Sequence, residues 1–221
     1  MSQPELSKII TGDGMSLRLR HWRLPQATRQ IVIVHGLGEH SGRYQKTAEH
    51  LVALGCDVLA YDQYGHGKSQ GKRGHLASDD QLLEHLRDVW RAIEPAAPTR
   101  RILLGHSLGG LLAAAAVARG FVRPDALVLS SPALAVDMAA WQRAAVRWLP
   151  RLAPNLTLGN GLNADYLSHD RRVVEAYRTD PLVHDRICAR LGAFVGDWQT
   201  KNARLAVPVL TVLFIASVSQ I

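Results

Sequence analysis

The chain of 221 residues lacks the features that mark secreted, membrane-spanning and metal-binding proteins. Its only cysteines, Cys56 and Cys188, have neither metal-site nor redox spacing, so a disulfide scaffold is excluded and a cytoplasmic location is expected. The longest apolar run, residues 207–215, is far shorter than the ~20 residues that a membrane helix needs. Charged side chains occupy the first 12 residues where a signal peptide would have an apolar segment, so we expect no signal peptide.

A concentrated basic stripe is also missing. The net charge is +7, from 26 Lys and Arg against 19 Asp and Glu, but the basic residues are scattered along the chain. This distribution argues against a nucleic-acid partner and predicts a solvated basic surface with at most weak peripheral contact with anionic membranes. The length suffices for one sizeable α/β domain, whereas the oligomeric state is left undetermined.

The most informative segment that is present is Gly-His-Ser-Leu-Gly-Gly at residues 105–110. The apolar residues 101–104 before it predict a buried strand, and the Ala-rich residues 111–119 after it predict a helix. A serine between glycines at such a junction is typical of the nucleophile elbow, where the helix amino end directs its partial positive charge toward the serine oxygen. Ser107 is therefore the predicted nucleophile; a Gly-rich turn with an incidental serine is the alternative.

A second turn predicts the groups that would stabilise an oxyanion. Residues 31–40, Ile-Val-Ile-Val-His-Gly-Leu-Gly-Glu-His, combine a buried-strand pattern with a flexible turn. In serine hydrolases of this layout, one oxyanion donor follows the nucleophile and the other follows an earlier strand, which predicts the backbone N–H groups of Leu37 and Leu108. An ordinary strand-to-helix loop is the alternative. The predicted supporting residues of the two turns are His35, Gly36, Gly105, His106 and Gly109.

Together these segments resemble the α/β-hydrolase superfamily and, within it, the monoacylglycerol lipase and lysophospholipase group of serine aminopeptidase-like hydrolases. The resemblance rests on residues 35–44, on Asp-Gln-Tyr-Gly-His-Gly-Lys-Ser-Gln-Gly at residues 62–71, and on residues 105–110. Residues 177–183 resemble part of that group's cap. The resemblance implies a mainly parallel sheet with helices on both faces, a helical cap, and catalysis without a cofactor or metal.

The order of elements predicts three parts. Residues 1–132 form the first part of the core, residues 133–203 the helical cap, and residues 204–221 the start of a returning core strand. Within the core, residues 16–23 alternate as a half-exposed edge strand does, and Ser78 is the predicted N-cap of an amphipathic helix. In the cap, Met138 and Trp141 are candidate substrate-binding residues, with packing inside the cap as the alternative for each.

The predicted acid and base are absent. The resemblance implies that both follow residue 210, but no Asp, Glu or His occurs after Asp197. His106 is a poor candidate for the base because successive residues of an elbow point in different directions. We therefore expect that the C-terminal strands and helices of the fold are missing, through a frameshift, a truncation or a genuine variation.

The sequence thus predicts a serine hydrolase of carboxylic esters that is inactive or severely impaired. The predicted substrate is a small-molecule lipid, either a monoacylglycerol or a lysophospholipid. One alternative is another acyl hydrolase, either a peptidase or a small-ester esterase. The other is a non-catalytic remnant or binding module of the same fold.

Overall fold

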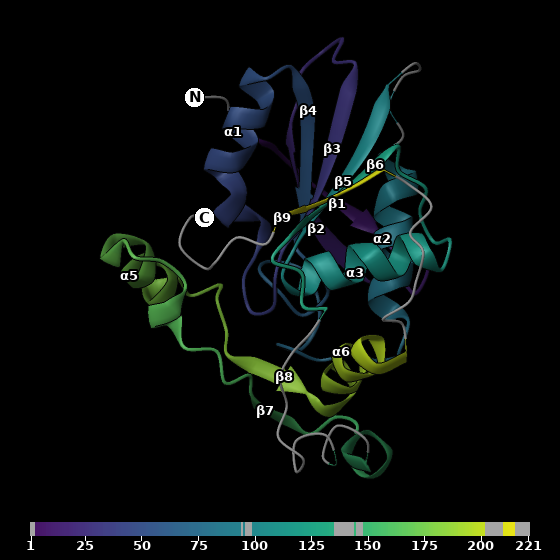
Figure 1. Ribbon diagram of the computed structural model, residues 1–221, viewed down its shortest axis with the longest axis vertical. Helices are drawn as coiled ribbons and strands as arrows, with labels where there is room; N and C mark the ends of the chain where they lie inside the picture. The colour runs from purple at the N-terminus through teal and green to yellow at the C-terminus, as the bar shows by residue number, and fades with distance from the viewer. Residues whose placement is uncertain are drawn as a thin grey trace.

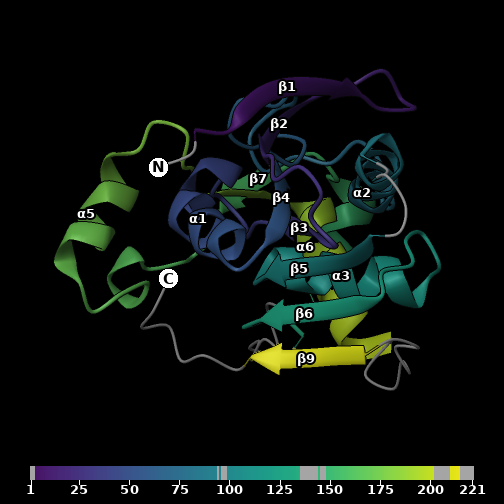
Figure 2. The same cartoon turned by 90° about the horizontal axis from the view of Figure 1, so that it is seen from above.

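The computed structural model describes residues 3–93, 95, 99–134, 144, 148–201 and 210–214. The main sheet has seven strands: β1 (Glu5–Ile10), β2 (Ser16–Trp22), β3 (Arg29–Val34), β4 (Cys56–Tyr61), β5 (Arg100–His106), β6 (Ala126–Ser130) and β9 (Leu210–Phe214). Their spatial order is β1-β2-β4-β3-β5-β6-β9, as Figure 2 shows from above. Strands β4, β3, β5, β6 and β9 are parallel, and β1 and β2 add an antiparallel end. The predicted mainly parallel sheet is confirmed.

Helices cover both faces of this sheet (Figure 2). The short 3₁₀ helix η1 (Ser41–Tyr44) leads into α1 (Gln45–Ala53) on one face, while α2 (Gln81–Ala92) and α3 (Leu108–Ala118) lie on the other. Because successive strand residues point to opposite faces, β3 divides its side chains between two cores. Ile31 and Ile33 join the cluster on the α1 side, and Val32 and Val34 join the larger cluster under α2 and α3.

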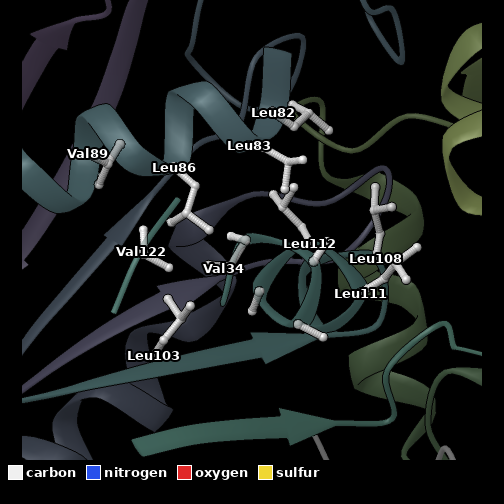
Figure 3. Close-up of a cluster of buried hydrophobic side chains, with 14 of the residues drawn as sticks. Val34, Leu82, Leu83, Leu86, Val89, Leu103, Leu108, Leu111, Leu112 and Val122 are labelled. Carbon is white, nitrogen blue, oxygen red and sulfur yellow. The ribbon is translucent and has the colours of Figure 1, made fainter. Parts of the chain in front are cut away.

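Helix α3 lies at the centre of the larger core. Figure 3 shows Leu83 of α2 directed toward Leu112 of α3 and Leu86 of α2 directed toward Val34 of β3. Residues 108–117 of α3 are all buried, as expected of a helix that is apolar on every side. The predicted elbow helix is therefore enclosed by the sheet and its neighbouring helices, which fixes its amino end in place.

Residues 148–201 lie in the predicted cap, are called the cap below, and are built from small elements. These are β7 (Thr157–Gly159), the 3₁₀ helix η2 (Ala164–Tyr166), α5 (Arg171–Thr179), β8 (Arg186–Cys188) and α6 (Ala189–Lys201). Strands β7 and β8 form a separate antiparallel pair, and α6 packs against α3. Figure 1 shows β7, β8 and α6 together below the main sheet and α5 to one side. Several apolar side chains of this region are exposed, Leu152 most of all.

Two local predictions are wrong. Strand β2 is not an edge, because β1 pairs along one side of it and β4 along the other. Ser78 is not an N-cap: α2 begins at Gln81 after Asp80, and the Gln81 side-chain oxygen accepts a hydrogen bond from Ala77 N at 2.9 Å. Met138, Trp141 and residues 215–221 lie outside the described residues. In the part that is described, no helix has the length and apolar character needed to cross a membrane.

Candidate active site

Ser107 occupies a strained turn between β5 and α3. Its backbone has φ 52° and ψ −118°, a conformation that costs a residue other than glycine about 1–3 kcal/mol. Neighbouring strands and the helix hold it there: Ser107 N donates to Ser130 O at 3.0 Å, and Ser107 O accepts from Leu111 N at 3.1 Å and Ala133 N at 3.0 Å. The junction of strand, strained turn and helix is the geometry expected of a nucleophile elbow, and the role of Ser107 as nucleophile stays a prediction.

The glycines around Ser107 are required by close backbone approach. A Cβ atom at Gly105 would clash with the carbonyl oxygen of Gly109, and one at Gly109 would clash with the carbonyl oxygen of Val34. A Cβ atom at Gly110 would lie 2.9 Å from Pro132 Cβ. Because the first two obstacles are backbone atoms, no side-chain rearrangement could relieve them. These glycines let the start of α3 pack directly on the ends of β3 and β5.

The loop of residues 35–40, which we call the oxyanion loop, meets the elbow. A Cβ atom at Gly36 would lie 3.3 Å from Ser107 Cβ. The strands that follow β3 in sequence lie on opposite sides of it, β4 on one and β5 on the other. The carboxyl ends of strands at such a switch point are where open α/β sheets bind ligands. The backbone N–H groups of Leu37 and Leu108 donate to no acceptor within the described part of the chain, so both remain available to an oxyanion.

His35 supports the oxyanion loop from inside the protein. It is fully buried, and its Nε2 accepts a hydrogen bond from Gln63 N at 2.9 Å. The proton must therefore be on Nδ1, which donates to Gly36 O at 2.8 Å. Burial lowers the pKa of His35, so the ring is neutral at pH 7. These bonds fasten the end of β3 to the loop after β4 and leave no free nitrogen for catalysis.

His106 is adjacent to Ser107 in sequence but turns away from it. Its Nδ1 lies 3.2 Å from the hydroxyl oxygen of Ser130, and burial lowers its pKa. Among the described residues, no hydrogen bond joins the Ser107 side chain to a histidine or a carboxylate. The structure therefore places the oxyanion loop against Ser107, and in the described part of the chain no histidine or carboxylate is hydrogen-bonded to that serine.

A polar cluster next to the oxyanion loop was missed by the sequence analysis. The Glu39 carboxylate accepts from Gly36 N at 2.6 Å and from the Tyr44 hydroxyl at 2.7 Å, and it pairs with Arg43 at 3.3 Å. The Arg43 guanidinium lies 4.7 Å from the ring centre of Tyr177, on α5. Burial and the Glu39 carboxylate raise the pKa of Tyr44, keeping it a hydrogen-bond donor. Only the spacing of Glu39 and Arg43 could have indicated this cluster.

Asp62 is the most deeply buried acid near the site, and its partners give it a structural role. Its carboxylate accepts from Ser41 N at 2.8 Å and from Lys68 N at 2.8 Å, which ties η1 to residues 62–70. Burial alone would raise the pKa of Asp62, but these hydrogen bonds hold it below its usual range. Within the described residues, no group of three or more His, Cys, Asp or Glu side chains is arranged to hold a metal ion.

The parallel sheet and the serine elbow define the chain as an α/β hydrolase. Residues 25–214 match the family model described as serine aminopeptidase, S33, so the chain belongs to that family. It is 40% identical over 190 residues to the monoacylglycerol lipase of Mycolicibacterium smegmatis, covering 82% of this chain and 68% of that protein. Against the human monoglyceride lipase the identity is 34% over 192 residues, covering 81% of this chain.

Solved structures agree with this family assignment. The crystal structure of the Paleococcus ferrophilus monoacylglycerol lipase has a TM-score of 0.76 and 36% identity, over 95% of this chain and 77% of that one. A soluble variant of the Saccharomyces cerevisiae monoglyceride lipase shares the fold, with a TM-score of 0.80 and 18% identity. The chain spans 60% of the length of the human monoglyceride lipase.

Proposed function

We propose that this chain is a serine hydrolase module for carboxylic esters of lipids, with a monoacylglycerol or a lysophospholipid as the substrate class. The observation that carries the proposal is the strained Ser107 elbow beside two backbone N–H groups, of Leu37 and Leu108, that have no acceptor in the described structure. The relatives named as monoacylglycerol and monoglyceride lipases support the lipid ester as substrate.

In the proposed reaction, Ser107 Oγ attacks the ester carbonyl carbon and the C=O electron pair moves onto oxygen. The N–H groups of Leu37 and Leu108 donate to this oxyanion, a contribution worth ~3–4 kcal/mol per donor in a comparable hydrolase. The C–O bond to the alcohol then breaks, leaving an acyl ester on Ser107 that water hydrolyses. A base must take the Ser107 proton and return it to the alcohol.

Among the described residues, no histidine forms a hydrogen bond with the Ser107 side chain that would let it act as that base. His35 has both nitrogens engaged, and His106 contacts Ser130. Loss of a complete triad lowers turnover about a million-fold in a well-studied hydrolase, while the oxyanion hole and substrate binding retain ~10³–10⁴ over water. We therefore propose that the 221 residues bind and orient the ester but turn it over slowly.

The polar cluster fits the alcohol part of such a substrate. The Glu39 carboxylate is engaged with Gly36, Tyr44 and Arg43, and the Arg43 guanidinium also lies over the ring of Tyr177 in the cap. The Arg43 guanidinium and the Tyr177 hydroxyl can donate hydrogen bonds. A glycerol-type head group and a phosphate-bearing head group each present hydrogen-bond acceptors, so either would suit these donors.

Phosphonate probes test the proposal because they report a single step, bond formation at the serine. We would compare an alkyl phosphonate with a glyceryl leaving group against a peptidyl phosphonate, and locate each adduct by peptide mapping. Ser107→Ala removes the proposed nucleophile. Ser130→Ala is the matched control, since Ser130 lies at the end of the neighbouring strand and contacts His106.

We expect the lipid-like probe to modify Ser107 slowly but faster than the peptidyl probe, in the unaltered chain and in Ser130→Ala alike. Faster reaction of the peptidyl probe would replace the lipid assignment with a peptidase. An adduct that persists in Ser107→Ala would refute the assignment of the nucleophile. Rapid, complete modification would show that a base is present after all.

A further inference from the structure

The cap meets the core through a short segment that contains His184. His184 N donates to Gly38 O of the oxyanion loop at 2.9 Å, and Cys188 N donates to Gly74 O at 2.8 Å. Between these two bonds, the ring of His184 faces the ring of His66, with 4.7 Å between their centres and 48° between their planes. Neither ring takes part in the proposed hydrolysis, so their pairing requires a separate explanation.

The contacts of His66 fix the position of its proton. Its Nδ1 lies 2.9 Å from the carbonyl oxygen of Tyr64, and a carbonyl can only accept. Nδ1 therefore carries the proton, and Nε2 presents a lone pair. His66 is only 1% exposed, and its Nε2 is shielded from solvent without a hydrogen-bond partner among the described residues.

The contacts of His184 fix the opposite arrangement. Arg186 N donates to His184 Nδ1 at 3.2 Å, so Nδ1 is an acceptor and the proton is on Nε2. This Nε2 is also shielded, and it too has no partner within hydrogen-bond geometry in the described structure. The Gly65 backbone also lies close to this ring and favours its protonated form. The cap thus presents a buried donor and the core a buried acceptor.

We propose that His66 and His184 form a latch between core and cap, in which one water molecule bridges the two rings, accepting from Nε2–H of His184 and donating to Nε2 of His66. The latch requires one proton on each ring. A second proton on His66 would remove the acceptor to which the water donates, and a second proton on His184 would displace the bond from Arg186 N. Acid therefore opens the latch and frees the cap segment from the oxyanion loop.

The surroundings of both rings resist the added proton. Around His66 lie His35 at the end of β3, His184 on the cap, and Arg73 on the loop after β4. His184 faces Arg73 and His35, and of its charged neighbours only Asp185 favours a proton. Burial, and then these neighbours, lower the pKa of His66 well below its usual range. The same causes, burial first, lower the pKa of His184 to about 4.

The direction of the pH effect follows from these pKa values. In the open state both rings would contact water and titrate near the ordinary value of about 6.5. Between that value and about 4, the open state binds more protons than the closed state, so the latch is complete above pH 6.5 and weakens as the pH falls. From pH 7 to pH 5, one such histidine shifts the closed-to-open ratio about 20-fold, and two shift it several hundredfold.

Amide hydrogen exchange measures this opening without any need for catalysis. We would follow the amides of His184 and Cys188 at pH 7 and pH 5, corrected for the pH dependence of intrinsic exchange. Their protection should fall several hundredfold in acid, while the amides of β3 and β5 keep theirs. His184→Phe retains a ring but removes one titrating group. In this variant, the protection of the same two amides should fall only about 20-fold from pH 7 to pH 5. His75→Gln is the matched control, because His75 also joins core to cap, through Asn155 at 2.8 Å.

The result for His75→Gln should match that for the unaltered chain. Equal protection at both pH values would overturn the latch, as would an unchanged acid response in His184→Phe. Nitrogen-15 NMR of the unaltered chain gives a second readout that needs no variant: at pH 7 the proton should be on Nδ1 of His66 and on Nε2 of His184. A proton on Nδ1 of His184 would refute the proposal.

Discussion

The elbow region and the cap are held in place by different kinds of contact. Around Ser107, backbone packs on backbone, and side chains at Gly105 or Gly109 would strike carbonyl oxygens. The cap is joined to the core by apolar side chains of α6, such as Leu191 and Phe194, and elsewhere by polar contacts of its side chains and loops, and it leaves Leu152 81% exposed. Backbone packing admits one arrangement, whereas polar contacts at a boundary can be exchanged for water. The reactive geometry therefore belongs to the core, and the cap is the part that can adjust.

The largest expected effect comes from Gly109→Ala. Its Cβ would clash with the carbonyl oxygen of Val34, so α3 must move away from the ends of β3 and β5. We expect a loss of at least ~3 kcal/mol in the free energy of unfolding, at the upper end for overpacking, together with loss of phosphonate reaction at Ser107. Urea unfolding and peptide mapping check the two effects. A Gly109→Ala chain of unaltered stability would contradict the described packing.

A smaller loss should follow removal of a core side chain. Leu86 of α2 is fully buried, so Leu86→Ala should lower the free energy of unfolding by about 2–4 kcal/mol. Leu152→Ala, in the cap, should change it by less than ~0.5 kcal/mol because that side chain is exposed. Urea unfolding midpoints at an unchanged slope measure both. Equal effects at the two positions would remove the contrast between core and cap.

Removing a polar contact between the cap and the core should have a smaller effect still. His40 of the oxyanion loop donates to the Asp180 carboxylate at 2.7 Å, in a largely buried pair. Asp180→Asn removes the charge and should cost ~1–2 kcal/mol, seen as about 5- to 30-fold faster exchange of the His184 amide. Asp165→Asn is the control, because Asp165 pairs with Arg178 in an exposed site. Faster exchange in the control alone would contradict the proposed attachment.

The smallest expected effect is a gain in stability from a substitution in the cap. Gly192 lies inside α6, and a Cβ there would meet nothing within 4 Å. Gly192→Ala should therefore stabilise the helix by ~0.5–1 kcal/mol, since alanine has the higher helix propensity. This is opposite in sign to Gly109→Ala, although both glycines lie in helices. A thermal melt of each variant compares them, and a lower melting temperature for Gly192→Ala would show that α6 is packed more tightly than described.

The sequence predicted those features whose cause is local. The elbow follows from an apolar strand, a glycine-flanked serine and an Ala-rich helix within 20 residues, and α2 shows its buried face in its own spacing. Strand β1 escaped prediction because nearly all its residues are exposed, and its pairing then turned β2 from an expected edge into an interior strand.

The features that were missed depend on residues distant in sequence. Arg43 meets Tyr177, and His66 meets His184, across more than 100 residues, so no local pattern could pair them. The proton positions on the two histidines follow from single hydrogen bonds to Tyr64 O and from Arg186 N, which only coordinates reveal. Whether residues 204–221 form a separate part and whether Ser107 is the nucleophile remain predictions.

The most direct test asks whether the core and the cap open as separate units. It measures amide exchange at pH 7 in increasing urea, below the unfolding transition. We predict that the amides of β3 and β5 exchange only through global unfolding, with a strong dependence on urea. The amides of His184 and Cys188 should exchange through a local opening of lower free energy and little urea dependence. If both sets show the same free energy and the same urea slope, core and cap open as one unit and the account is wrong.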